Sequence, residues 1–225
     1  MAKKRSQHTP QLFAVLGLGR FGSSVALTLA RMGHEVIAVD VSEEKVQAVA
    51  SVVTHAAQAD TTDEVAMRAL GMRNVDVAVV SIGDLEASVL TTLVLRSQGV
   101  KSIVAKAVSD AHGRVLDKVG ADKVVYPERD MGFRVAHNLV SGNFIDYLEL
   151  VPGYSIVELM APASFFSRTL RQLDLRARLG VSIIAIRRGE DIEVGPGADD
   201  KIQEGDILVA MGRDDMLDSI ENGVR

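Results

Sequence analysis

The sequence predicts a doubly wound α/β domain built on a parallel sheet, followed by a crossover helix and a small α+β domain. Three observations lead to this prediction. Short apolar runs alternate with amphipathic helical stretches over residues 11–127, a pattern typical of a parallel sheet covered on both faces. A glycine-rich loop follows the first apolar run. After residue 149, expected strands are separated by short turns that contain glycine and aspartate.

Composition limits the class of protein before any motif is considered. The chain has 225 residues, 47% of them hydrophobic, a formal net charge of −5 and no cysteine. The negative charge argues against a nucleic-acid groove or a polybasic membrane anchor, and the lack of cysteine excludes disulfides and zinc–thiolate sites. No apolar run approaches the roughly 18 residues of a membrane span. We expect a cytoplasmic protein that binds no nucleic acid and has a disordered tail at residues 1–10.

The elements of the first domain follow from its apolar runs and from the breakers between them. Several expected helices end at a glycine, and Ser42 is the expected N-cap of the second helix. The expected strands are 12–17, 34–40, 53–58, 75–82, 101–107 and 122–127, and the helices between them are 21–32, 42–51, 61–71, 84–98 and 109–120. Such repeated strand–helix units make a doubly wound sheet of Rossmann type at residues 11–127.

The loop GLGRFG at residues 17–22 has the pattern G-x-G-x-x-G, directly after a strand and at the start of a helix. Gly17 permits the tight turn, Gly19 lets the backbone approach a pyrophosphate, and Gly22 lets the helix pack closely on the strand. The helix N-terminus supplies amide donors and a favourable dipole for phosphate. In this context the motif predicts a site for an adenine nucleotide.

Polar side chains at the ends of the other strands extend this candidate site. Asp40 ends the second strand, where a carboxylate accepts from a ribose 2′-hydroxyl and repels a 2′-phosphate. The carboxyl ends of parallel strands share one crevice. The further candidate nucleotide-binding residues are Phe21 in the loop, Lys45 after Asp40, Asp60, Ser81 with Ile82 and Gly83, and Lys106. ATP, ADP and NAD(H) all fit these requirements, whereas a 2′-phosphorylated dinucleotide does not.

Residues for a reaction on the bound nucleotide are missing from the sequence. The five histidines form no pair at metal-ligand spacing, and no Tyr-x-x-x-Lys pair, Gly-x-Ser-x-Gly elbow or Walker-type Gly-Lys-Ser/Thr occurs. We therefore expect a binding protein with no catalytic residues. The alternative is an NAD(H)-binding oxidoreductase or an NAD(H)-sensing regulator.

A second region begins after the last strand of the sheet. Residues 128–141 have the apolar spacing of a helix, with Met131 and Leu139 on one stripe. The stretch NFIDYL at 143–148 adds three large apolar side chains, a surplus typical of a dimer contact. We therefore assign residues 128–148 to a crossover and dimerisation helix.

The remaining residues, 149–225, predict a small α+β domain that can bind a ligand or a partner. It has strands expected at 154–161, 181–189, 190–196 and within 199–212, a helix and loop at 167–180, and a closing helix at 213–223. No catalytic constellation occurs among them, so this domain is expected to serve in recognition.

Three stretches show a resemblance to a known family: AVLGLGRFGSSVA with LARMGHEVIAVDVSEEKVQ, then GADKVVYPERDMG, then IQEGDILVAMG. Together they resemble the Ktr-type RCK proteins, cytosolic regulators of bacterial potassium transport. The resemblance implies a nucleotide sensor that is not an enzyme. It also implies homodimers that assemble into a homo-octameric ring on the inner face of the membrane, docked on a KtrB/TrkH-like transporter subunit. In that family ATP favours the active state and ADP the inactive one.

The resemblance also implies roles for single residues of the first domain. Arg20 falls on an arginine that reaches the terminal phosphate of a nucleotide in the neighbouring subunit, as suits a guanidinium fork. Glu128 falls on a glutamate near that phosphate, where Mg²⁺ or another cation bridges carboxylate and phosphate. Asp40 and Lys106 fall on residues that contact the nucleotide.

In the second domain the resemblance implies a cyclic di-AMP site in a dimer cleft. Arg176 falls on the phosphate-binding arginine, and Leu175 on the apolar position beside it. Ser182 stands where some relatives have an asparagine, and Arg178 is a nearby alternative to Arg176.

Overall fold

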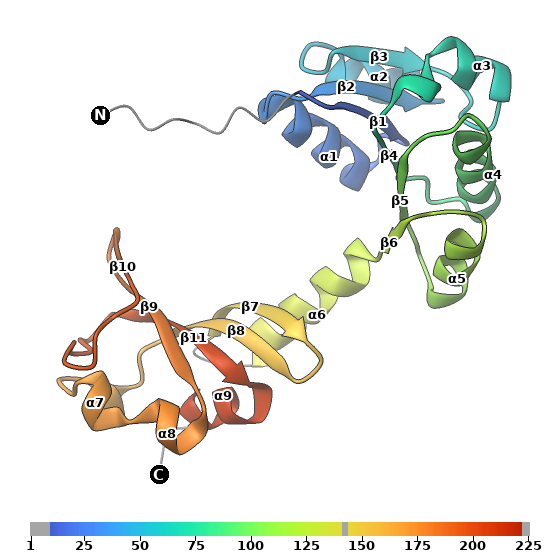
Figure 1. The fold of residues 1–225 in the computed structure, drawn as a ribbon. Coiled ribbons are helices and arrows are strands. Elements are labelled where there is room, and N and C mark those ends of the chain that lie inside the picture. Colours follow the sequence, from blue (N-terminus) through green and yellow to red (C-terminus); the bar gives the residue numbers. More distant parts are fainter. Residues whose placement is uncertain (1–9, 141–143, 222–225) are drawn as a thin grey trace. The chain divides into compact units, whose positions relative to one another are not determined.

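The computed structural model of the chain describes residues 10–140 and 144–221. The chain divides into two compact units, residues 1–128 and 129–225, and each has its own sheet (Figure 1). Each unit also has its own hydrophobic core. The tail expected at residues 1–10 lies, except for its last residue, outside the described residues.

The first unit is a six-stranded parallel sheet with connecting helices. Its elements are β1 (Leu12–Leu16), α1 (Arg20–Arg31), β2 (Glu35–Asp40), α2 (Glu43–Ala50), β3 (His55–Gln58), α3 (Glu64–Ala69), the short 3-10 helix η1 (Met72–Asn74), β4 (Val77–Val80), α4 (Leu85–Ser97), β5 (Ser102–Lys106), α5 (Asp110–Lys118) and β6 (Lys123–Val125). The strand order is β3-β2-β1-β4-β5-β6. The chain reverses direction across the sheet beside β1, which places a crevice at the carboxyl ends of β1 and β4.

Both faces of this sheet are buried, because successive side chains of one strand enter different cores. Leu16 of β1 packs in one core with Leu95 of α4. Its neighbour Val15 packs in another with Ala26 of α1 and Val46 of α2. Helices α3, α4 and α5 therefore cover one face, and α1 and α2 cover the other. The predicted doubly wound fold class is confirmed.

The second unit is built on an antiparallel sheet. Its elements are α6 (Pro127–Val140), which begins at the end of the first unit, β7 (Phe144–Val151), β8 (Tyr154–Met160), the 3-10 helix η2 (Ala163–Phe165), α7 (Leu170–Leu173), α8 (Leu175–Leu179), β9 (Ser182–Arg188), β10 (Asp191–Val194), β11 (Ile207–Arg213) and α9 (Asp214–Glu221). The strand order is β10-β9-β11-β8-β7. Leu159, Ile186 and Leu208 of the sheet pack against Leu173 and Leu217 of the helices. The predicted small α+β domain is confirmed.

The helix assigned to residues 128–148 is shorter than predicted. Helix α6 ends at Val140, and residues 144–148 belong to β7, which pairs antiparallel with β8. Gly153, with a φ of 84°, forms the turn between these two strands. The prediction of helix over 144–148 is wrong because a dense apolar stretch suits a helix or a strand, and only the pairing with β8 decides between them. The dimerisation role stays a prediction.

Candidate functional site

The glycine loop lies between β1 and α1 at the carboxyl edge of the first sheet. A Cβ atom at Gly22 would lie 1.9 Å from the Gly17 carbonyl oxygen, and one at Gly17, whose φ is 90°, would lie 2.9 Å from the Ser81 backbone. A Cβ atom at Gly19 would meet nothing within 4 Å. Glycine is thus required at 17 and 22 for the packing of the loop itself, whereas Gly19 borders open space.

The first turn of α1 is free to bind an anion. Gly19 is the N-cap of this helix and supplies no side chain to its first amides, and no acidic residue occurs in the first turn. The leading N–H groups of a helix have no partners within the helix, and the helix dipole favours negative charge there. The arrangement is the one that binds phosphate in other glycine loops.

Asp40 closes this loop from the end of β2. Its carboxylate accepts hydrogen bonds from the backbone N–H of Leu18 at 2.7 Å and of Ser42 at 2.9 Å, and the Lys45 ammonium lies 3.4 Å away. The side chain is only 6% exposed. Ser42, the expected N-cap of α2, makes no capping hydrogen bond with its own side chain. Asp40 therefore holds the loop in place. A carboxylate has about four acceptor sites, so one remains for a ribose hydroxyl.

A cavity of about 430 Å³ lies along the strand ends beside this loop. A cavity of this size is in the range used for small-molecule ligands. It brings together many of the residues predicted from the sequence: Gly17, Gly19, Asp40, Lys45, Asp60, Ser81, Ile82, Gly83 and Lys106. The buried Ser81 hydroxyl has no hydrogen-bond partner within the described part of the chain.

Four lining residues were not predicted: Val41, Thr61, Asp84 and Ala87. Val41, Thr61 and Asp84 each directly follow a residue that the sequence did single out, so extending every strand end by one residue would have found them. Asp84 accepts the backbone N–H of Ala87 at 2.8 Å and so starts α4 at the cavity wall. Thr61 is buried, and its hydroxyl lies 2.7 Å from that of Thr91 on α4.

The other predicted residues lie outside the wall of this cavity. Phe21 and Gly22 belong to the first turn of α1, and Gly22 is packed against the loop. Arg20, the first residue of α1, is exposed and has no hydrogen-bond or ion-pair partner among the residues that the structure describes. Its guanidinium is thus available to a group from outside the unit.

Glu128 is connected to the cavity through Lys106. The Lys106 ammonium donates to the Glu128 carboxylate at 2.9 Å, with the lysine side chain 12% exposed and the glutamate side chain 67% exposed. The hydrogen bond from Lys106 holds the pKa of Glu128 below its usual range. Glu128 therefore stays ionised at neutral pH, and an anion in the cavity would compete with it for Lys106.

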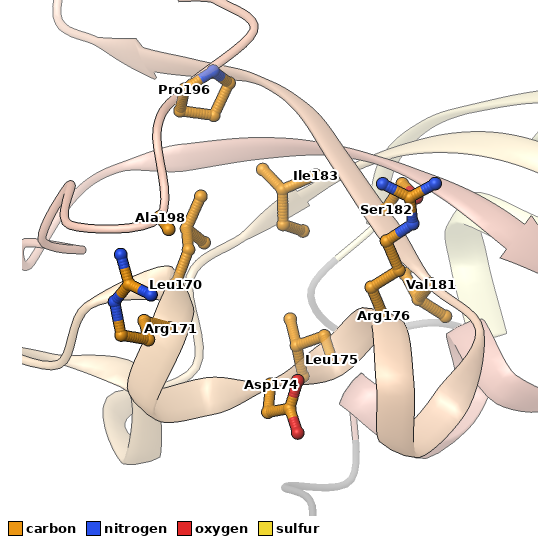
Figure 2. A pocket seen from close by; sticks show the side chains of 10 residues that line it. All are labelled: Leu170, Arg171, Asp174, Leu175, Arg176, Val181, Ser182, Ile183, Pro196 and Ala198. Atoms are coloured by element: carbon orange, nitrogen blue, oxygen red, sulfur yellow. The ribbon is translucent and has the colours of Figure 1, made fainter.

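The second unit has a separate cavity of about 400 Å³ beside α7, α8 and β9. Figure 2 shows Arg171 and Arg176 on opposite sides of it, with Leu170, Leu175 and Ile183 between them. The predicted Leu175, Arg176 and Ser182 all line this cavity, whereas Arg178 does not. Asp174, with a φ of 47°, ends α7 and redirects the chain into α8, which places Arg176 at the rim.

Comparison with known families and proteins agrees with this division. The TrkA-N domain model matches residues 13–127, and the TrkA-C domain model matches residues 154–223. Ktr system potassium uptake protein C of Bacillus subtilis is 48% identical over 201 residues, which are 89% of this chain and 91% of that protein. The chain belongs to the Ktr/TrkA family. Ktr system potassium uptake protein A of the same organism is 45% identical, over 93% of this chain and 95% of that protein.

Solved structures support the same fold for this Ktr/TrkA chain. The crystal structure of the GsuK RCK domain matches with a TM-score of 0.65 and 18% identity, over 97% of this chain and 48% of that one, so the chain spans about half of its length. Among the described residues, no helix is long and apolar enough to cross a membrane. The described residues also hold no group of three or more His, Cys, Asp or Glu side chains arranged for a metal ion.

Proposed function

We propose that this Ktr/TrkA chain is the nucleotide-sensing regulatory subunit of a potassium transporter, and that it binds ATP and ADP in the cavity at the strand ends of its first unit. One observation supports this most directly. The glycine loop, the Asp40 carboxylate and the Lys45 and Lys106 ammonium groups line one cavity, as the binding of ribose and phosphate requires.

The chemistry of the wall fits an adenine nucleotide. The open backbone at Gly19 and the uncapped start of α1 suit the pyrophosphate, and Asp40 suits a ribose hydroxyl. The Ser81 hydroxyl, which has no partner among the described residues, offers a further polar contact. Because Asp40 would repel a 2′-phosphate, ligands of the NADP type are disfavoured.

Arg20 supplies the discrimination between ATP and ADP. It lies outside its own cavity, is exposed, and is the first residue of the phosphate-binding helix. In a homodimer it would reach the terminal phosphate of the partner's nucleotide, which only ATP carries. A ligand shifts a conformational equilibrium only through a difference in affinity for the two states, and a contact to the third phosphate alone creates such a difference.

Glu128 fits a cation only together with the nucleotide. The described residues hold no ready metal cluster, so Mg²⁺ or another cation at Glu128 would take its remaining ligands from phosphate oxygens and water. Such a cation would also relieve the repulsion between the Glu128 carboxylate and a triphosphate.

We expect Arg20→Ala to weaken ATP binding on the order of tenfold and to leave ADP binding within about twofold of the original, since a charge-assisted contact to the third phosphate is lost. Calorimetric titration of nucleotide-free protein with ATP, ADP and NADH measures this. Arg31→Ala, at the other end of α1 and also exposed, is the matched control and should bind all three ligands unchanged. Tightest binding of NADH, with an unaltered ratio of ATP to ADP affinity in Arg20→Ala, would favour the NAD(H)-sensing alternative.

The proposed partner is a membrane potassium transporter subunit of KtrB/TrkH type, contacted from the cytoplasmic side by an octameric ring of dimers. The names of the relatives support the link to potassium uptake. Exposed apolar side chains on α6, namely Met131, Phe133, Val135 and Leu139, support an association between copies of the chain. The ring itself rests on the family resemblance.

The cavity of the second unit supports a proposed site for cyclic di-AMP. Two arginines flank an apolar floor, which suits a ligand with two phosphates and two flat bases. Arg176→Ala is expected to weaken binding of cyclic di-AMP at least about tenfold, measured by calorimetry with the intact chain. Arg178→Ala is the control, because Arg178 lies outside the cavity. If Arg178→Ala abolishes binding and Arg176→Ala does not, the site has been assigned to the wrong arginine.

A further inference from the structure

A fully buried histidine in the first unit has no part in the nucleotide site described above. His112 lies in the first turn of α5 and is 0% exposed. One ring nitrogen, Nε2, lies 2.8 Å from the hydroxyl of Ser88 on α4, and the other, Nδ1, lies 3.3 Å from the backbone N–H of Val108. The ring thus joins α4 to the loop between β5 and α5.

The hydrogen bonds define the protonation state of this ring. A backbone N–H can only donate, so Nδ1 must accept from Val108 and carries no proton. The proton of the neutral ring is then on Nε2 and is donated to the Ser88 hydroxyl. Ser88 in turn donates its own hydrogen to the Leu85 carbonyl at 2.9 Å. Each hydrogen atom of this network then has one acceptor, and only the neutral imidazole satisfies this arrangement.

Both ends of this network lie next to the cavity wall. Val108 is two residues beyond Lys106, the cavity lysine that pairs with Glu128. On α4, Ser88 adjoins the lining residue Ala87, and the next turn carries Thr91, which bonds the lining residue Thr61. The buried side chains of α4 therefore connect the loop after β3 with the loop after β5.

We propose that the neutral His112 imidazole is a positioning residue for the Lys106 side of the nucleotide cavity, and that its protonation weakens nucleotide binding. This inference rests on the proposed function. A second proton on the ring would sit on Nδ1 and face the Val108 N–H, so two donors would oppose each other and that hydrogen bond would be lost. The Ala107 N–H would still donate to the Val125 carbonyl, at 2.9 Å, but the loop would lose its hydrogen bond at Val108.

Ionisable groups surround His112 on α5 and on the elements packed beside it. The ionisable groups on α5 itself and on the elements next to it are Asp84, Glu86, Arg96, Lys106, Asp110, Arg114, Asp117, Lys118, Asp122, Lys123 and Tyr126. Burial lowers the pKa of His112. Because the folded pKa lies below the unfolded one, the folded state loses stability as pH falls from about 6.5 through the folded pKa.

Two variants separate the positioning role from simple packing. His112→Asn keeps an acceptor near the place of Nδ1 for the Val108 N–H, whereas His112→Gln keeps a polar group only near the place of Nε2. We expect His112→Asn to bind ATP at about pH 8 within about twofold of the original protein, and His112→Gln to bind about two- to tenfold more weakly. Equal loss in both variants would indicate a packing role only and would overturn the inference.

The pH dependence supplies the second test. ATP dissociation constants are measured by calorimetry at about pH 8, above the ordinary histidine pKa of about 6.5, and at a pH below the midpoint at which the Val108 amide titrates in the NMR experiment described next. At each pH, the dissociation constant of the original protein is divided by that of His112→Asn. This ratio cancels the effect of the ionisation of ATP, which is the same for both proteins. We expect this ratio to be about two- to tenfold higher at the low pH than at about pH 8, because the original protein then binds ATP more weakly. A constant ratio overturns the inference.

A third readout needs no ligand. In the NMR spectrum of the unliganded protein, the Val108 amide is expected to titrate with a midpoint below about 6.5 and to be invariant in His112→Asn. If the Val108 amide does not titrate, the inference is overturned and the proposed function is unaffected. If the original protein fails to bind both ATP and ADP at about pH 8, the proposed function fails, and the inference about ligand binding fails with it.

Discussion

Gly22→Ala is expected to abolish nucleotide binding and to lower the free energy of unfolding of the first unit by about 2–4 kcal/mol. The added Cβ atom would lie 1.9 Å from the Gly17 carbonyl oxygen and 3.0 Å from the Ser81 hydroxyl oxygen. Alanine in place of glycine inside a helix ordinarily stabilises by about 1 kcal/mol. The clash wins here because the obstructing atom belongs to the backbone of the loop, which cannot rotate away as a side chain does.

The matched control for this variant is Gly19→Ala. At Gly19 an added Cβ atom meets nothing within 4 Å, and the φ of −66° suits any residue. We therefore expect its free energy of unfolding, measured with urea, to equal that of the original protein within about 0.5 kcal/mol. ATP affinity should fall at least about tenfold, because the methyl group occupies the space that the pyrophosphate needs. Equal ATP affinity in Gly19→Ala and the original protein would contradict phosphate binding at this loop.

Asp206→Ala is expected to destabilise the second unit by about 2–3 kcal/mol. The carboxylate is 0% exposed and accepts from Arg188 Nε and Nη2, both at 2.8 Å, and from the Gln203 backbone N–H at 2.8 Å. Its removal leaves the Gln203 amide without its acceptor at the turn that leads into β11. Arg188 is 46% exposed, so water can solvate its guanidinium, which keeps the cost below that of a fully buried pair.

Urea unfolding measures the loss of stability in Asp206→Ala. Hydrogen exchange of the backbone amides of β8 and β11 measures whether that loss lies in the second unit. Arg213 and Asp215 form a similar two-pronged pair, at 3.1 and 2.7 Å, but both side chains are more than half exposed. Asp215→Ala should therefore change stability by less than about 0.5 kcal/mol. If Asp206→Ala and Asp215→Ala lower the free energy of unfolding equally, burial of the Asp206 carboxylate is not the reason for its contribution to stability. Nucleotide binding by the first unit should be unaffected in both.

Lowering the pH should reproduce part of the loss of stability expected for Asp206→Ala. The hydrogen bond with Arg188 is the main cause that holds the pKa of Asp206 below its usual range. Since the folded pKa is depressed, the stability from this group is present above the unfolded value of about 3.9 and is lost as pH falls through the folded pKa.

Much of the candidate site follows from the sequence because parallel strands share one carboxyl edge. Asp40, Asp60, Ser81 and Lys106 are far apart along the chain, yet each directly follows or ends an apolar run, and the structure places all of them around one cavity. The roles of Gly17 and Gly22 follow from the motif in the same way. Each is a consequence of local pattern and fold class, which is the information that one sequence contains.

The pairing of particular atoms is a different matter. The sequence predicted a ribose acceptor at Asp40 but not its hydrogen bond to the Leu18 N–H, and it singled out Lys106 and Glu128 without the ion pair between them. Likewise the apolar stretch over 144–148 gave no sign of its pairing with β8. These features depend on where distant segments meet.

The sequence by itself determined the two-domain class, the glycine loop and the set of strand ends that carry polar side chains, because periodicity and residue type act over a few neighbouring positions. Only the tertiary structure decided that Asp40 bonds the backbone of the glycine loop, that Arg20 lies outside the cavity wall and that the His112 ring lies between Ser88 and Val108. The physical reason is that a hydrogen bond requires donor and acceptor within about 3 Å in a suitable direction, a condition that the packing of non-local segments sets.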